Sequence, residues 1–207
     1  MAATSGPGSP THRALLVVDV QPTFCEGGEL AVAGGDAVAA AIARHAHEHR
    51  LDYDLVVTTQ DWHVDPGDHF AADPDYVDTW PAHGVAGTPS AELHPALAAL
   101  AQDPDVVAVR KGAHAAAYSG FEGVCADGTP LADVLTARGI EAVDVVGIAS
   151  SHCVAATALD ALAVGLRTRV LADLSVGVSV AAEQAAYRRL TAAGAEVAGR
   201  SATPGAA

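Results

Sequence analysis

Short apolar runs rich in β-branched residues alternate along the chain with longer, alanine-rich segments. The apolar runs cover residues 14–20, 54–60, 106–109, 142–148 and 167–173, with a shorter one at 195–199. The segments between them predict helices over 36–50, 131–138, 152–164 and 181–193, with stops at Gly139, Gly165 and Gly194. Strands that are apolar on both faces are typical of a parallel sheet covered by helices. The pattern therefore predicts an α/β fold, a three-layer α/β/α domain around a mostly parallel sheet of about six strands.

The same pattern places a single domain over residues 12–200. A chain of 207 residues, half of them hydrophobic, can bury one substantial core but hardly two. The two ends, 1–11 and 201–207, are mostly Gly, Ser, Pro, Ala and Thr with little to bury, so we expect a disordered tail and a flexible tail. No internal repeat or interdomain linker interrupts the region between them.

The amino-acid composition limits the kinds of molecule that the protein is expected to bind. Asp and Glu number 25 against 11 Lys and Arg, which disfavours nucleic acid and anionic membrane surfaces. The three cysteines are odd in number and widely spaced, which indicates reduced thiols rather than a disulfide framework. The first residues lack the features of a signal peptide, and no apolar run approaches a membrane span. We therefore expect a cytoplasmic protein with no nucleic-acid or membrane partner. The composition is compatible with a homo-oligomer.

Polar side chains follow four of the apolar runs. Asp19 and Gln21 stand at the end of the first run, Asp61 and His63 follow the second, and Lys111 follows the third. The fourth is followed by the group Ser151, His152 and Cys153. Sites in open parallel sheets form at the carboxyl ends of the strands, so these residues are expected to converge on one edge.

Cys153 has the setting of a nucleophile. It stands at the start of a predicted helix, where free backbone N–H groups and the helix dipole lower a thiol pKa and can hold an oxyanion. Lys111 would stabilise the thiolate, and Asp19 would move its proton. A lone cysteine is more often a small buried hydrophobe, but the convergence favours the catalytic interpretation. Cys25 and Cys125, in glycine-containing loops, are interpreted as incidental.

A second constellation combines one carboxylate with three imidazoles in loops that follow a strand, Asp61, His63, His69 and His83. This ligand set suits Zn, Fe(II), Mn or Co, although scattered surface histidines are the alternative. By contrast, "RHAHEHR" places three histidines on a predicted helix, and we interpret them as a solvated face: His45, His47 and His49.

Taken together, these segments resemble the nicotinamidase (pyrazinamidase) family of the isochorismatase-like cysteine hydrolase superfamily. "VVDVQPTFCEGGEL" resembles its first-strand motif, and "QDWHVDPGDHF" with "TWPAHGVAGT" resembles its metal loops. "VRKGAH" resembles its lysine segment and "GIASSHCVAATALDA" its nucleophile turn. Order and spacing agree across nearly the whole chain.

The resemblance implies roles for individual residues. The catalytic triad would be Asp19, Lys111 and Cys153. The N–H groups of Ala149 and Cys153 would form the oxyanion hole, after a cis peptide between Ile148 and Ala149. One divalent metal ion, Zn, Fe or Mn, would be held by Asp61, His63, His69 and His83, with no organic cofactor. The slot for a flat ring would be lined by Phe24, Trp80, Tyr118 and His152.

The implied reaction is hydrolysis of a small heteroaromatic amide, such as nicotinamide or a pyrazinamide-like compound, through a cysteine thioester. It would serve NAD salvage and pyridine nucleotide biosynthesis. A metal-independent superfamily amidase acting on carbamoyl or ureido compounds would share the triad. A hydrolase that uses a metal-bound hydroxide, with Cys153 only structural, and a noncatalytic α/β binding domain are the other readings.

Overall fold

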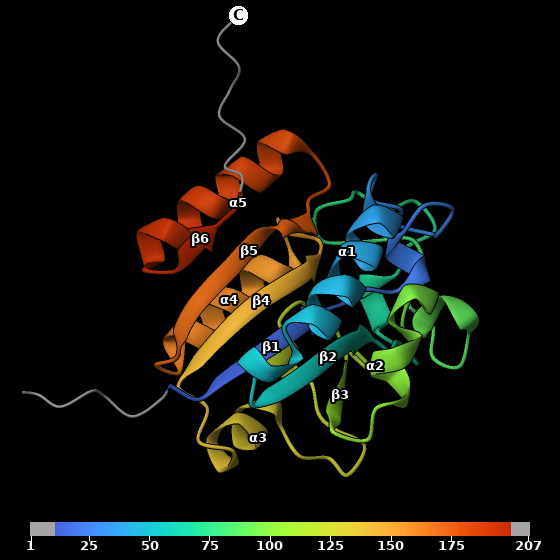
Figure 1. The fold of residues 1–207 in the computed structure, drawn as a ribbon. Helices are drawn as coiled ribbons and strands as arrows, with labels where there is room; N and C mark the ends of the chain where they lie inside the picture. Colours follow the sequence, from blue (N-terminus) through green and yellow to red (C-terminus); the bar gives the residue numbers. More distant parts are fainter. Residues whose placement is uncertain (1–10, 200–207) are drawn as a thin grey trace, which may run out of the picture.

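A computed structural model describes residues 11–199, so residues 1–10 and 200–207, most of the two expected tails, lie outside it. The fold is built on a six-stranded sheet with the order β3-β2-β1-β4-β5-β6, in which every neighbouring pair is parallel. The strands are β1 (Arg13–Val18), β2 (Leu55–Asp61), β3 (Val106–Lys111), β4 (Ala142–Ile148), β5 (Arg167–Val176) and β6 (Glu196–Ala198). The predicted three-layer fold with a parallel sheet is confirmed (Figure 1).

Helices cover both faces of the sheet, and the alternation of side chains along β1 shows why. Leu15 and Val17 pack with α1 and α2, whereas Leu16 and Val18 pack with α3, α4 and α5. All four side chains are fully buried, as expected for a central parallel strand. The helices are α1 (Gly35–Glu48), α2 (Ala98–Gln102), α3 (Leu131–Ala137), α4 (Cys153–Ala163) and α5 (Val180–Ala193).

The element boundaries agree closely with those expected from the sequence, with two differences. Strand β5 runs on to Val176, and the short helix α2 was not predicted. Short 3-10 turns lie in the connections of the described part of the chain, at Pro22–Phe24, Arg50–Asp52, Gly67–His69, Pro89–Ala91, Pro95–Leu97 and Gly120–Glu122. Gly194 ends α5 in the left-handed conformation, with a φ of 103°, as the stop signal predicts.

The order of the strands creates a crevice at one edge of the sheet. From β1 the chain first adds strands on one side, β2 and then β3, and afterwards on the other side with β4. At such a switch point the two connections leave in opposite directions and open a gap at the carboxyl ends of the central strands. Asp19 directly follows β1 and Ala149 directly follows β4, so both lie at this gap.

The amino ends of the strands are closed by a buried ion cluster. Asp144 in β4 is fully buried and pairs with Arg13 and Arg169, and it accepts a hydrogen bond of 2.9 Å from the Tyr53 hydroxyl. His45 extends this network, because its Nε2 lies 2.9 Å from the same hydroxyl. The interpretation of all three helix histidines as a solvated face is therefore wrong for His45, which is half-buried.

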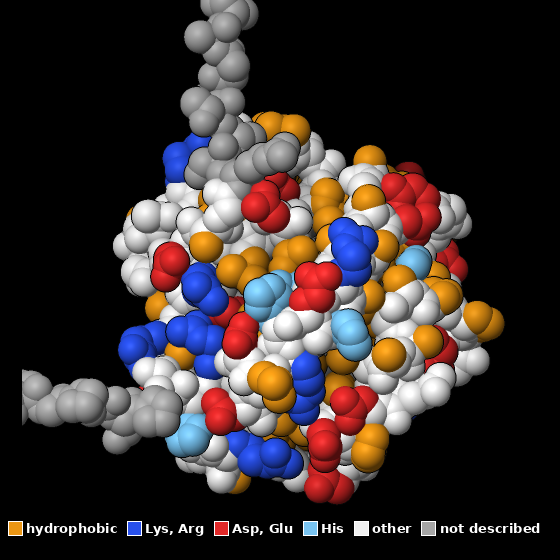
Figure 2. Space-filling view, in the orientation of Figure 1, with side chains coloured by type: hydrophobic (Ala, Val, Ile, Leu, Met, Phe, Trp, Pro, Cys, Tyr) orange, Lys and Arg blue, Asp and Glu red, His pale blue; other side chains and the backbone are white. Residues whose placement is uncertain are grey.

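Within residues 11–199, no helix is both long enough and apolar enough to cross a bilayer. Figure 2 shows one face of the molecule, on which acidic, basic and apolar side chains lie interspersed. On this face the basic side chains do not merge into the broad stripe that a phosphate backbone requires.

Gly147 provides a test of the packing between the two central strands. Its φ is 127°, and a Cβ at this position would lie 2.0 Å from the Val18 carbonyl oxygen. Gly147→Ala must push β1 and β4 apart, and we expect it to lower the free energy of unfolding in urea by more than about 3 kcal/mol. Gly139→Ala is the control, because Gly139 also has a positive φ, 63°, but has open space around it. It should cost only about 1 kcal/mol, and equal losses would contradict a steric origin.

Candidate active site

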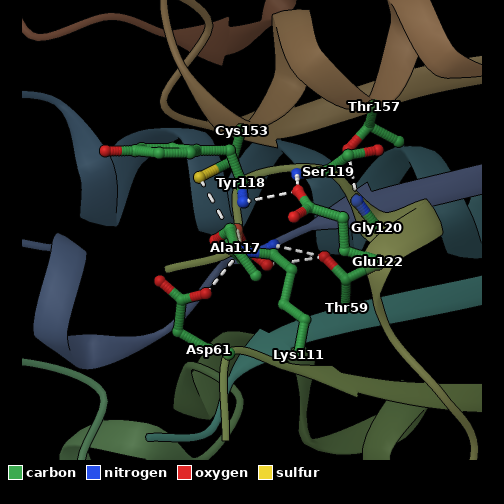
Figure 3. A network of polar contacts seen from close by, with 12 residues as sticks. Thr59, Asp61, Lys111, Ala117, Tyr118, Ser119, Gly120, Glu122, Cys153 and Thr157 are labelled. Atoms are coloured by element: carbon green, nitrogen blue, oxygen red, sulfur yellow. Dashed lines mark hydrogen bonds and ion pairs between the residues drawn. The ribbon is translucent and has the colours of Figure 1, made fainter. Parts of the chain in front are cut away.

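Lys111, the last residue of β3, lies at the centre of a buried polar cluster (Figure 3). Its Nζ is 3.0 Å from Asp19 Oδ2 and 3.9 Å from Cys153 Sγ, and it also donates to Asp61 Oδ1. A fourth partner is the Ala117 carbonyl oxygen, at 3.0 Å. The four side chains come from four different segments and are almost completely buried. The structure therefore brings together the three residues of the expected triad.

Burial and mutual contact shift the pKa values of this cluster. Burial raises the pKa of Asp19, an effect that Lys111 only partly offsets. Burial alone would lower the pKa of Lys111, but the two carboxylates Asp19 and Asp61 raise it, so the amine stays an ammonium ion. Burial also raises the pKa of Cys153 well above its usual value, despite Lys111. The expected lowering of this pKa at the helix start is wrong, so the thiol is protonated and needs a base.

The segment that follows β3 is shaped by a capping box. The Ser119 hydroxyl accepts from the Phe121 N–H, and the Glu122 carboxylate accepts from the N–H groups of Tyr118 and Ser119. The Gly120 N–H donates to Thr157 in α4 at 2.9 Å, which links the segment to the helix that begins at Cys153 (Figure 3). These bonds hold the Ala117 carbonyl against Lys111.

The histidines expected to bind a metal also converge. One nitrogen from each of His63, His69 and His83 lies within 4.8 Å of the other two. The Nε2 atoms of His63 and His83 are each 3.7 Å from Asp61 Oδ2. The carboxylate of Asp61 therefore faces Lys111 with one oxygen and the histidines with the other. All four residues are buried.

The hydrogen bonds of the imidazoles fit a metal ligand set. His63 Nδ1 lies 2.6 Å from the Gly112 carbonyl oxygen and His83 Nδ1 lies 2.8 Å from the Pro81 carbonyl oxygen. A carbonyl only accepts, so each Nδ1 carries the hydrogen and each Nε2 presents a lone pair. His63 Nε2 and His69 Nδ1 are buried and have no hydrogen-bond partner among the described residues. These unpaired nitrogens beside a carboxylate suit a divalent cation.

Burial keeps two of these imidazoles neutral. It lowers the pKa of His83 to about 4, and it also lowers the pKa of His69. Only neutral imidazole has a lone pair for a metal, so the site is ready for one at neutral pH.

A cavity of about 550 Å³ joins the two clusters. Its lining includes Asp61, His69 and His83 on one side and Ala149 and Cys153 on the other. The four expected ring-binding residues also line it, Phe24, Trp80, Tyr118 and His152.

Two of the expected ring-binding residues are joined by a hydrogen bond and form one wall of the cavity. Trp80 Nε1 donates to the Tyr118 hydroxyl at 3.0 Å, and the His152 ring stands nearly perpendicular to Trp80, with centroids 5.8 Å apart. The peptide bond between Ile148 and Ala149 is cis, as the resemblance implies. Cys25 and Cys125 do not line the cavity, and burial raises the pKa of Cys25 to about 12, in line with an incidental role.

Some residues that build the site were missed by sequence reasoning. Thr59 donates to Asp19 Oδ1 at 2.6 Å. Gln21 was expected at these strand ends, but its role was not: its side chain binds both the N–H and the carbonyl oxygen of Asp61. The backbone of Gly112 can lie close to His63 only because glycine has no side chain. A Cβ at this position would lie 2.5 Å from the imidazole. A glycine directly after the lysine was a visible signal for such close approach, whereas a threonine inside a strand carries none.

Comparison with known proteins agrees with this geometry. The model of the isochorismatase domain matches residues 13–202. The chain is 52% identical over 185 residues to the nicotinamidase/pyrazinamidase of Mycobacterium tuberculosis. The aligned region covers 89% of this chain and 97% of that protein.

Two solved structures are also similar. The pyrazinamidase of Pyrococcus horikoshii in complex with zinc has a TM-score of 0.78 and 32% identity, covering 91% of this chain and 99% of that chain. PnC1 from L. infantum in complex with nicotinate has a TM-score of 0.76 and 34% identity, covering 91% of this chain and 92% of that chain. With a domain model that spans nearly all of its length and relatives of this identity, the chain belongs to the isochorismatase domain family.

Proposed function

We propose that the protein is a cysteine amidohydrolase that converts nicotinamide, and pyrazinamide-like heteroaromatic amides, to the carboxylic acid and ammonia. The observation that carries this proposal is the buried Lys111 ammonium, which holds the Asp19 carboxylate beside the Cys153 thiol at the wall of the cavity. The relative from Mycobacterium tuberculosis is a nicotinamidase/pyrazinamidase, and the L. infantum structure contains nicotinate, the acid that such a reaction releases.

The reaction begins with proton transfer. The Cys153 thiol has a raised pKa and gives its proton to Asp19, whose own pKa is also raised by burial, which makes this carboxylate a stronger base than it would be in water. Lys111 stabilises the negative charge as it moves from carboxylate to sulfur. The thiolate then attacks the carboxamide carbon and forms a tetrahedral intermediate.

The charge that develops on the substrate oxygen meets the N–H groups of Ala149 and Cys153. A donor of this kind contributes roughly 3 kcal/mol in acyl-transfer sites. Protonated Asp19 returns its proton to the leaving nitrogen as the carbon–nitrogen bond breaks, and ammonia departs. Asp19 then takes a proton from a water molecule as that water attacks the thioester carbon. The carbon–sulfur bond breaks, the acid is released, and Asp19 returns the proton to sulfur, which regenerates the thiol.

The ring is oriented by the opposite side of the cavity. The rigid wall of Trp80 and Tyr118 and the Phe24 ring suit a flat heteroaromatic group. Asp61, His63, His69 and His83 would hold one Zn, Fe(II) or Mn ion, which would supply a Lewis-acid contact for the ring nitrogen. The zinc complex of the Pyrococcus horikoshii pyrazinamidase supports such a cation.

We place this activity in the cytoplasm, where three unpaired thiols are stable. Its product class, a pyridine carboxylic acid, would feed NAD salvage and pyridine nucleotide biosynthesis.

Replacing the thiol tests the nucleophile. We expect Cys153→Ala to lower the rate of ammonia release from nicotinamide by at least about 10³-fold, because no other group in the cavity can form the thioester. Metal content, measured in parallel, should stay unchanged. Cys125→Ser is the matched control, since Cys125 is a free thiol outside the cavity, and it should keep wild-type activity.

The outcomes separate the alternatives. Retained turnover in Cys153→Ala would favour a metal-bound hydroxide as the nucleophile. Wild-type turnover on carbamoyl or ureido compounds alone would favour the metal-independent amidases of the superfamily. Absence of any amide turnover would leave a noncatalytic binding domain.

Metal analysis tests the histidine cluster. The purified protein should carry about one divalent ion per chain, and His69→Ala should weaken its retention against a chelator by at least about tenfold. His47→Ala, on the exposed face of α1, should have no effect. Chelation should abolish nicotinamide turnover, and added metal should restore it. Full activity in protein shown to be free of metal would contradict the proposed role of the ion.

A further inference from the structure

Thr59 lies in β2, next to the point where β1 ends and Asp19 follows. It is paired with Val18 across β1 and β2, and its side chain is fully buried. The Thr59 hydroxyl donates to Asp19 Oδ1 at 2.6 Å, and it lies 3.2 Å from the Asp19 backbone nitrogen, whose N–H donates to it. A hydroxyl has only one hydrogen. The same backbone N–H is shared with the Thr59 carbonyl oxygen, at 3.1 Å. An ionised carboxylate has no hydrogen to donate, so in the 2.6 Å contact the hydroxyl is the donor and its hydrogen points to Oδ1.

The two oxygens of Asp19 are therefore unequal. Oδ1 faces a hydrogen-bond donor, so a proton on this atom would meet the hydrogen of the Thr59 hydroxyl. Oδ2 lies 3.0 Å from Lys111 Nζ and has no aligned hydrogen-bond donor among the described residues. A proton on Oδ1 would displace the hydrogen bond from Thr59, whereas a proton on Oδ2 leaves that bond in place and weakens only the ion pair with Lys111.

We propose that Thr59 is a positioning residue that makes Asp19 a one-sided proton shuttle, with Oδ2 as the only atom that receives and returns the proton. This inference rests on the proposed function. In the first step the S–H bond of Cys153 breaks and an O–H bond forms at Oδ2. In the second step that O–H bond breaks and an N–H bond forms on the leaving nitrogen, as the carbon–nitrogen bond opens.

The surroundings of Asp19 set the direction of the effect on pH. Lys111 from β3, Asp61 from β2 and Cys153 from α4 are the charged or titratable groups that face it. Burial raises the pKa of Asp19, and the hydrogen bond from Thr59 works against this rise. Without the hydroxyl this pKa rises further. Activity needs ionised Asp19, so the acidic limb of the pH profile must move to higher pH.

Two substitutions separate the hydroxyl from the shape of the side chain. Thr59→Val keeps the branched shape, including the methyl group that lies against Gly120, where an added Cβ would approach it to 2.9 Å. Thr59→Ser keeps the hydroxyl and loses that methyl group. Thr58→Val is the matched control, because Thr58 is the neighbouring buried threonine and its hydroxyl has no partner in residues 11–199.

The hydrolysis of nicotinamide is the first measurement. Thr59→Val should lower kcat about tenfold, with KM within about twofold of wild type, and should move the acidic limb upward by about half to one pH unit. Thr59→Ser should lose thermal stability but keep kcat within about twofold. Thr58→Val should match wild type in all three quantities.

Alkylation of Cys153 by iodoacetamide, followed by mass spectrometry of the intact holoenzyme, is the second measurement. It needs no substrate, so it tests Thr59 even if the proposed amidase activity fails. The pH midpoint of alkylation should rise in Thr59→Val and stay unchanged in Thr59→Ser and Thr58→Val. Equal behaviour of Thr59→Val and wild type would overturn the inference, as would equal impairment of the Ser and Val variants.

Discussion

A buried cation without water must be surrounded by negative charge, and the Lys111 ammonium imposes this condition on the whole edge of the sheet. Its partners come from the loop after β1, from the end of β2 and from the start of α4. Two carboxylates, Asp19 and Asp61, compensate this one positive charge, and without both of them the ammonium would lie uncompensated in the interior. The same interaction therefore holds the strand ends together and sets the proton chemistry of the thiol.

The two edges of the sheet show opposite uses of buried charge. At the amino ends, Asp144 is paired with two arginines and a tyrosine, so its carboxylate is fully satisfied and has a structural role. At the carboxyl ends, Asp19 Oδ2, His63 Nε2 and His69 Nδ1 are buried without hydrogen-bond partners within the described region. Asp19 Oδ2 meets only the Lys111 ammonium, at 3.0 Å, and the two imidazole nitrogens lie in the histidine cluster beside the Asp61 carboxylate, so these three atoms are placed to accept a proton or a ligand.

Asp61 connects the two halves of the candidate site. One of its oxygens pairs with Lys111, and the other faces the imidazoles of His63 and His83. A cation held by the histidines would therefore lie next to a residue that also fixes the ammonium. In the proposed reaction, the position of the substrate ring and that of the Cys153 thiol would both depend on this one carboxylate. Gln21 holds the backbone of Asp61 in place through two hydrogen bonds.

The sequence by itself determined the sheet, the four main helices and the convergence of Asp19, Asp61, Lys111 and Cys153, because strand period and the carboxyl-end rule depend only on local order along the chain. The cysteine pKa and the role of Thr59 were decided by the tertiary structure. The helix start predicts a more acidic thiol, but the layers packed around it remove water and raise its pKa instead. The role of a buried threonine hydroxyl depends on its hydrogen-bond partner. For Thr59 that partner is Asp19, 40 residues away in the chain, so the sequence around Thr59 does not reveal it. Burial and long-range hydrogen bonds are properties of the assembled interior.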